Sequence, residues 1–223
     1  MDANLTTVRI DIVSDVICPW CYIGKRQLEL ALPMLARDGL ALDVHWRAYQ
    51  LNPDMPPGGV ERNAYRQQKF GSLARSQELD AQVAAAGAAV GLDIHHALMR
   101  RTPNTVAAHR VIWLADRHGV QNPVQDSLFR GYFVEGRDLG DFETLVELAE
   151  RGGLPANETA ALLACSDGAK EVLEEDAGAR ASGLNGVPTF TMMGHVLFSG
   201  AVPADTMAEA FVHAWRVLGR NAA

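Results

Sequence analysis

One feature constrains the fold of this chain more than any other: a short strand pattern that is followed directly by a pair of closely spaced cysteines. Residues 8–13 alternate apolar and polar side chains and are rich in β-branched residues, which is typical of a strand with one buried face. Cys18-Pro19-Trp20-Cys21 follows, and Pro19 suits the first turn of a helix. Apolar or small residues then recur on one helical face until Asp38-Gly39: Gly24, Leu28, Ala31 and Leu35. The sequence therefore predicts a strand-turn-helix unit with both cysteines at the helix start.

This placement gives the cysteines different chemical roles. The positive end of the helix dipole and the free backbone N–H groups there favour a thiolate at Cys18. Two intervening residues on a helical turn bring Cys21 within bonding reach, so it can attack a mixed disulfide formed on Cys18. We expect Cys18 to be a nucleophile and Cys21 a resolving thiol, with Trp20 offering apolar surface to a partner chain.

The main alternative for a C-x-x-C pair is half of a zinc site. Zinc needs two further ligands, such as a second C-x-x-C or an H-x₃₋₅-H pattern. The sequence holds neither pattern, and its histidines are scattered or adjacent. Redox chemistry is therefore favoured, and no metal or other cofactor is expected beyond the Cys18–Cys21 couple.

Composition narrows the class of partner. The chain has 223 residues, 48% of them hydrophobic, which is enough for a sizeable core. A formal charge of -7 argues against nucleic acid. Residues 1–7 lack the pattern of an export signal and no stretch is apolar enough to span a bilayer, so we expect a cytoplasmic protein without a membrane partner. Three cysteines in that reducing compartment argue against a structural disulfide framework.

The rest of the chain divides into three parts. Residues 40–49 alternate like a strand, and the breaker-rich run 52–59 marks a boundary. Residues 60–165 look helical without a comparable strand, whereas two strands (189–193 and 195–198) and a helix after Pro203 close the chain. We predict an α/β sheet covered on both faces, with residues 1–55 and 167–223 forming one domain and residues 56–166 forming a helical insertion.

The loop Gly186-Val187-Pro188-Thr189-Phe190 is the second element of interest. By composition alone it is an ordinary turn. An X-Pro at the entrance of a strand, coupled to an upstream strand-C-x-x-C-helix unit, is a candidate cis peptide bond. Beside Cys18, Pro188 would expose the Val187 backbone to a substrate strand and deny a metal its approach.

The run from Ser14 to Lys25, SDVICPWCYIGK, resembles the opening of FrnE-type proteins in the DsbA-like thioredoxin family. The segments 103–105, 108–110, 186–190 and 199–201 recur in that family's order, so the resemblance spans nearly the whole chain. It implies a thioredoxin fold with a helical insertion and a thiol–disulfide oxidoreductase acting on protein or small-molecule thiols and disulfides. It also implies these roles: nucleophile Cys18, resolving thiol Cys21, cis-proline Pro188 preceded by Val187, and Asn104 and Thr105 facing the active-site cleft. A helix N-cap explains Asn104 and Thr105 equally well.

A sister branch of the same fold uses glutathione. It contains 2-hydroxychromene-2-carboxylate isomerases and kappa-class glutathione transferases, which typically carry serine at the nucleophile position. Having both Cys18 and Cys21 departs from that pattern and favours disulfide exchange. A glutathione-dependent isomerase or transferase remains the alternative, with glutathione as co-substrate, and a non-catalytic holdase with an apolar cleft around Trp20 is a third hypothesis. The sequence leaves the oligomeric state open.

Four other residues have a functional and a structural interpretation. Asp11 or Asp15 could exchange the proton of Cys21, but Asp15 could cap the first turn and Asp11 could be a solvated strand residue. His109 could point to the cleft, although a hydrogen-bonded structural histidine is favoured. Cys165 follows an apolar helix end and is interpreted as a small core side chain rather than a third redox thiol.

Overall fold

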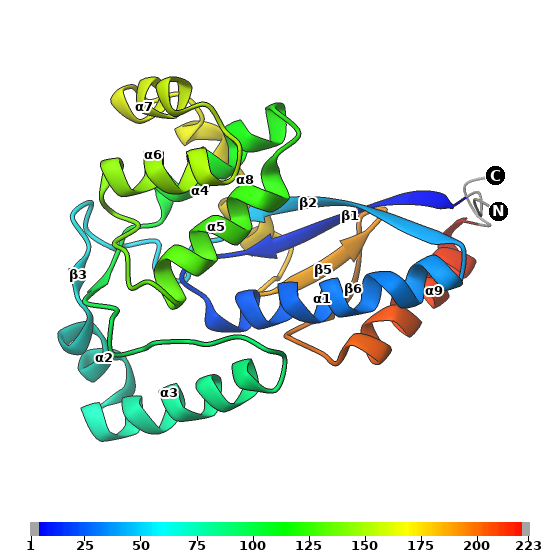
Figure 1. The fold of residues 1–223 in the computed structure, drawn as a ribbon, viewed down its shortest axis with the longest axis horizontal. Coiled ribbons are helices and arrows are strands. Elements are labelled where there is room, and N and C mark those ends of the chain that lie inside the picture. The colour runs from blue at the N-terminus through cyan, green and yellow to red at the C-terminus, as the bar shows by residue number, and fades with distance from the viewer. Residues whose placement is uncertain (1–4, 220–223) are drawn as a thin grey trace.

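The computed structural model describes residues 5–219, which contain a four-stranded sheet and a small two-stranded one (Figure 1). The larger sheet has the order β2-β1-β5-β6; β1 pairs parallel with β2 and antiparallel with β5, and β5 pairs antiparallel with β6. The strands are β1 (Thr6–Ser14), β2 (Leu40–Ala48), β3 (Val60–Glu61), β4 (Arg101–Thr102), β5 (Thr189–Met192) and β6 (His195–Ser199).

Most of the remaining residues lie in helices. Their bounds are α1 (Pro19–Arg37), α2 (Arg62–Phe70), α3 (Leu73–Ala88), α4 (Val106–Arg117), α5 (Gln121–Phe133), α6 (Phe142–Arg151), α7 (Ala156–Ala164), α8 (Ala169–Ala181) and α9 (Ala204–Leu218). None of these helices combines the length and apolar character that a bilayer span requires.

Local sequence explains the unit β1-α1-β2. Ile10 and Ile12 of β1 are fully buried, as the period of two predicts. Pro19 occupies the first turn of α1, where a missing N–H costs no helical hydrogen bond. After Asp38, Gly39 adopts a positive φ of 78° and turns the chain back into β2. This parallel β-α-β unit places the cysteines at the end of β1.

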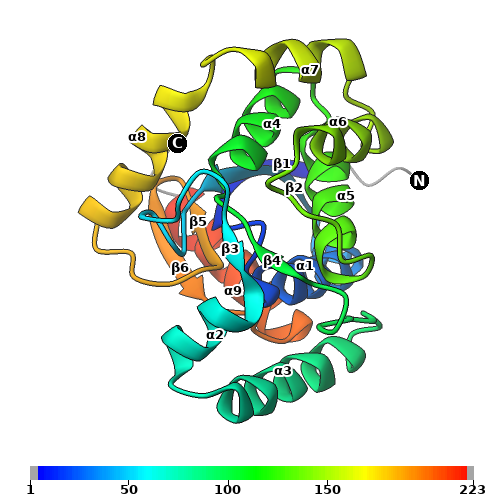
Figure 2. The same ribbon diagram turned by 90° about the vertical axis from the view of Figure 1, so that its left-hand side faces the viewer.

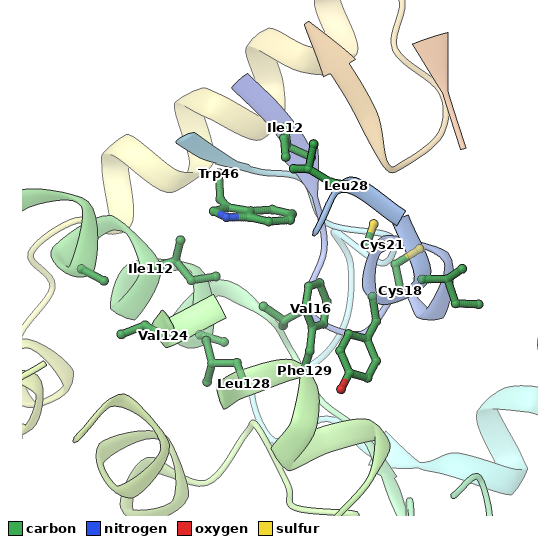
Figure 3. Packing of buried hydrophobic residues seen from close by; sticks show 14 of the residues in the cluster. Ile12, Val16, Cys18, Cys21, Leu28, Trp46, Ile112, Val124, Leu128 and Phe129 are labelled. Atoms are coloured by element: carbon green, nitrogen blue, oxygen red, sulfur yellow. The ribbon is translucent and has the colours of Figure 1, made fainter. Parts of the chain in front are cut away.

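Helices surround the sheet in two groups. α1 and α9 pack against each other along the sheet, while α4, α5 and α8 contact β2; Figure 1 shows the groups on opposite sides. Figure 2 shows α2 and α3 as a separate hairpin beyond the sheet. The stacked rings of Tyr22 on α1 and Phe129 on α5 lie 5.2 Å apart and bring the two groups together below the cysteines. Figure 3 shows Phe129 among the buried side chains near the cysteines.

Side chains from helices cover the outer edge of β2 at its C-terminal end. Gln121 of α5 accepts the Trp46 N–H at 2.7 Å and donates to the Trp46 carbonyl at 3.1 Å. From α8, Glu175 accepts the Ala48 N–H at 2.8 Å, and Asp176 accepts the Gln50 N–H at 2.8 Å just past the strand. Polar side chains thereby replace a neighbouring strand.

The structure confirms most of the predicted elements, including the α/β fold with a helical insertion. Residues 60–165 hold no strand comparable in length to β1 or β2, as expected, but the two-residue strands β3 and β4, which the sequence did not predict, pair there. These two-residue strands are too short to leave a period-two pattern in the sequence. The domain boundaries at residues 55/56 and 166/167 stay a prediction; one continuous hydrophobic core includes residues from both parts.

Candidate active site

Cys18 lies in the connection between β1 and α1. It is the N-cap residue of α1, with extended backbone angles (φ -87°, ψ 112°), and its N–H donates to the Asp15 carbonyl at 3.0 Å. Its Sγ contacts the Val187 carbonyl at 3.6 Å. The thiol therefore meets the N-terminus of α1 on one side and the loop before β5 on the other.

Cys21, one turn into α1, is fully buried. The cysteines are unbonded thiols in this structure, and Figure 3 shows both at the same end of α1. Burial raises the pKa of the Cys21 thiol well above its ordinary range, and the adjacent Cys18 raises it further. The nearby Ser14 side chain and Asp15 backbone oppose this rise in the pKa of Cys21. Cys21 thus holds its proton tightly.

The loop before β5 packs onto the motif. The Val187–Pro188 peptide bond is cis, as the sequence predicted. A Cβ added to Gly24 of α1 would lie only 3.0 Å from Pro188 Cγ, so glycine is what allows the helix to approach this proline. Val187 precedes the β5 ladder, which begins at Thr189.

A cavity of about 350 Å³ opens beside Cys18. The motif contributes Cys18, Pro19 and Trp20 to its wall, and the loop before β5 contributes Val187. The α2–α3 hairpin and α5 supply the opposite wall, largely through apolar and aromatic side chains. The Trp20 side chain is 42% exposed at this opening. Cys18, Trp20 and Val187, three of the predicted site residues, therefore share one cavity.

The hairpin places three cations and one carboxylate along this cavity. Arg62 and Arg66 both pair with Asp80, and His96 Nδ1 lies 3.4 Å from it. Burial lowers the pKa of His96, against the opposing effect of the Asp80 charge. Lys69 is exposed and has no carboxylate partner among residues 5–219. Cations thus outnumber the carboxylate, which favours an anionic ligand.

Sequence reasoning missed these charged residues of the cavity. Arg62, Arg66 and Lys69 are spaced as i, i+4 and i+7, which places them on one face of α2. That spacing was the available signal. It did not reveal that the helix would lie opposite Cys18, because this depends on contacts distant in sequence.

Asn104 and Thr105 lie at the start of α4, and neither is among the residues that line the cavity. The Asn104 side chain donates to the Met55 carbonyl at 2.7 Å and accepts the Val106 N–H at 3.0 Å. Thr105 is the N-cap residue but makes no capping bond with its side chain. The structure favours a local structural role for Asn104, and substrate contact by either residue stays a prediction.

The two aspartates near the motif are in different surroundings. Asp11 is half-buried and pairs with Arg47 at 2.7 Å and Arg9 at 3.1 Å. Asp15 is fully buried and does not cap α1; its Oδ2 accepts the Leu51 N–H at 2.7 Å. His109 of α4 is buried and directs Nε2 towards Asp15 Oδ1, 3.3 Å away. His109 does not line the cavity beside Cys18; it pairs with Asp15 in the interior, although its Nε2 makes no hydrogen bond among the described residues, so the favoured structural interpretation stays a prediction.

The interpretation of Cys165 as a core side chain is wrong. Cys165 is exposed, because α7 ends at Ala164 and the chain leaves the helix there in an extended conformation. Its Sγ contacts the Leu162 carbonyl at 3.3 Å. The apolar run before Cys165 therefore marks the buried face of α7 and not the position that follows it.

Comparison with known proteins places the chain in a family. A family profile described as "DSBA-like thioredoxin domain" matches residues 9–212. The crystal structure of a probable DsbA oxidoreductase from Streptomyces coelicolor is 33% identical with a TM-score of 0.82, covering 93% of this chain and 90% of that one.

Two more distant structures share the fold. The cytosolic disulfide reductase DsbM from Pseudomonas aeruginosa, solved with GSH, is 18% identical with a TM-score of 0.59, covering 96% of this chain and 98% of that one. A 2-hydroxychromene-2-carboxylate isomerase is 17% identical with a TM-score of 0.61 and the same coverage. The family match and the Streptomyces structure show that this chain belongs to the DsbA-like thioredoxin domain family of thiol–disulfide oxidoreductases.

Proposed function

We propose that this chain exchanges thiols and disulfides through Cys18 and Cys21, with Cys18 as the nucleophile. The observation that carries the proposal is the unequal environment of the two thiols. Cys18 borders a cavity at the N-terminus of α1, whereas Cys21 is fully buried behind it with a raised pKa. An incoming disulfide therefore meets Cys18 first.

The reaction begins when the Cys18 thiolate attacks one sulfur of a substrate disulfide. A bond forms between Cys18 and that sulfur, and the other substrate sulfur leaves as a thiolate. Cys21 then loses its proton and attacks Cys18 Sγ, which releases the second substrate thiolate and leaves the Cys18–Cys21 disulfide. The cysteine pair is oxidised by two electrons and the substrate is reduced. The same steps run in reverse when the chain oxidises a dithiol.

Insulin reduction by dithiothreitol tests this proposal. The wild-type protein should accelerate precipitation of the insulin B chain, and Cys18→Ser should abolish the acceleration. Cys165→Ser is the matched control: it removes an exposed thiol outside the cavity and should retain the rate. An unchanged rate in Cys18→Ser would refute the proposal.

Glutathione use is a second candidate, favoured by the charge of the cavity. Arg66 and Lys69 face the opening beside Cys18, and glutathione carries two carboxylates. The distant DsbM structure was solved with GSH. A disulfide-exchange role for glutathione requires the Cys18 thiol, because a second glutathione can replace Cys21 in resolving the mixed disulfide, whereas an isomerase or transferase role, in which the glutathione thiol reacts, survives Cys18→Ser. Calorimetric titration with glutathione, followed by turnover in Cys18→Ser, separates the two.

A further inference from the structure

Asn52, Tyr65 and Lys69 form a hydrogen-bonded triangle in the wall of the cavity beside Cys18. The Lys69 ammonium donates to the Tyr65 hydroxyl at 2.6 Å and to Asn52 Oδ1 at 3.2 Å, and the Tyr65 hydroxyl donates to Asn52 Oδ1 at 2.6 Å. Asn52 lies in the connection between β2 and β3, whereas Tyr65 and Lys69 lie one turn apart on α2. The triangle therefore joins the segment after β2 to the α2–α3 hairpin.

The directions of these hydrogen bonds follow from the donors available. An ammonium group can only donate, so the oxygen of the Asn52 amide, and not its nitrogen, faces Lys69. The Tyr65 oxygen likewise accepts from Lys69, which leaves its single proton for Asn52 Oδ1. Both acceptors of the ammonium are uncharged. Lys69 is thus held in place without being neutralised.

Two donors of the triangle are left without an acceptor. Among the described residues, Asn52 Nδ2 is buried without a hydrogen-bond partner, and the Lys69 ammonium has no carboxylate partner. In the same cavity, by contrast, Asp80 pairs with both Arg62 and Arg66. A buried donor without a partner is rare because it costs free energy. A negatively charged group that only accepts hydrogen bonds, such as a carboxylate, fits this place.

The rest of the cavity wall determines what the body of a substrate can be. Most of this wall is apolar or aromatic, with Trp20, Phe70 and Phe133 among its side chains. Cys18 is only 4% exposed and lines the same cavity, so a substrate sulfur reaches it from within the cavity. The remaining atoms of that substrate then lie between apolar side chains and the Lys69 triangle.

We propose that Asn52 and Tyr65 position the Lys69 ammonium to bind a carboxylate of the substrate. The preferred substrate of the Cys18–Cys21 couple is then a thiol or disulfide that joins a carboxylate to an apolar body. The inference rests on the proposed exchange reaction and names the substrate class of that site.

Dihydrolipoate and dihydrolipoamide test the proposal, because these dithiols share one alkyl body and differ only in a carboxylate that is replaced by a neutral amide. Each is mixed in excess with the oxidised protein in a Cys165→Ser background, which removes the exposed third thiol. One thiolate of the reductant attacks Cys18 Sγ and Cys21 leaves; the second reductant thiolate then attacks the mixed disulfide and releases Cys18. Two electrons and two protons pass from the reductant to the cysteine pair, and the reductant closes its own disulfide ring. Acid quenching and alkylation of the thiols, counted by mass spectrometry, give the rate constant for each dithiol.

The background protein should react about two- to fivefold faster with dihydrolipoate than with dihydrolipoamide, the range that an exposed ion pair supports. Added salt should reduce this ratio. Asn52→Asp keeps the shape of the side chain but supplies Lys69 with a carboxylate, so it should bring the ratio of the two rate constants to one or below. Asn63→Asp, the same change at an exposed position of α2 outside the cavity wall, is the control and should keep the ratio.

The ratio separates recognition of the carboxylate from a general loss of structure, because misfolding lowers both rate constants together. Equal rate constants for the two dithiols in the background protein would overturn the inference, as would equal changes of the ratio in Asn52→Asp and Asn63→Asp. Failure of the oxidised protein to accept electrons from either dithiol would instead overturn the exchange reaction, and the inference with it.

Discussion

The residues around the cysteine motif fall into two groups. Cys18, Trp20 and Val187 form the cavity side, and Cys21, Ser14 and Asp15 form the buried side. One helical turn separates Cys18 from Cys21. The cavity side has apolar walls and unbalanced cations. The buried side has a proton held by a thiol with a raised pKa and polar atoms that lack partners. In the proposed exchange reaction this difference gives two chemically identical side chains different tasks: Cys18 meets the substrate disulfide, and Cys21 gives up its proton when it resolves the mixed disulfide.

The largest expected effect comes from removing the resolving thiol on the buried side. Cys21→Ser should lower multiple-turnover insulin reduction at least about 100-fold, or ~2.7 kcal/mol of transition-state free energy, because the mixed disulfide on Cys18 cannot be resolved internally. Mass spectrometry should find the substrate attached to Cys18. Normal turnover by Cys21→Ser, without this adduct, would show that Cys21 does not resolve the mixed disulfide and would contradict the different roles of the two sides.

The second-largest effect is expected at the contact between α1 and Pro188 in the loop before β5. Gly24→Val should lower the free energy of unfolding by about 1–3 kcal/mol, because even its Cβ would lie 3.0 Å from Pro188 Cγ. Gly178→Ala, on an exposed part of α8 with open space around it, is the control and should add about 0.5–1 kcal/mol. Urea denaturation measures both. Equal effects would show that the approach of α1 to this loop is not tight.

The pH dependence of stability sharpens the description of the buried side. Because the pKa of Cys21 is raised in the folded protein, the unfolded chain loses this proton first as pH rises. The contribution to stability is therefore complete below the ordinary thiol pKa of about 8.5 and declines above it, by at most ~1.4 kcal/mol per pH unit. Urea denaturation of the reduced protein between pH 7 and 10 should show this decline. Cys21→Ala should reduce the slope, and an identical slope in that variant would contradict the buried thiol as its source.

The smallest expected effect concerns charge on the cavity side. Lys69→Met should raise KM for glutathione disulfide, an anionic substrate, about two- to fivefold, the range that an exposed ion pair supports. KM for the neutral hydroxyethyl disulfide should not change. Lys170→Met, at an exposed position on α8, is the control. High salt should remove the difference between wild type and Lys69→Met; a persistent difference would indicate a packing role for Lys69 instead.

Patterns confined to neighbouring residues were sufficient to predict much of the fold. The alternation in β1, Pro19 at the start of α1 and Asp38-Gly39 after its end all act within a few residues, and the structure confirms each element. The cis bond before Pro188 was predicted from its place at a strand entrance and from family resemblance.

Contacts distant in sequence limited the prediction of the site. The sequence places Cys18 and Val187 far apart, and only the paired strands β1 and β5 bring them within 3.6 Å. The cavity needs α2 and α3 to fold back over the motif, and the pairing of Arg62 with Asp80 has no local signature. No periodicity relates Asp15, which follows β1, to His109 on α4, so local patterns do not predict that the two side chains lie 3.3 Å apart.

The covered edge of β2 limits how copies of this chain can associate. An uncovered strand edge offers backbone groups to another chain and can seed open-ended stacking. Here Gln121, Glu175 and Asp176 already occupy the edge groups at and just past the end of β2. Among residues 5–219 no strand lies beyond β6, where His195 and Val196 are exposed. A strand added at the end of β2 would have to displace these side chains, so the sheet is better protected at this edge than at β6.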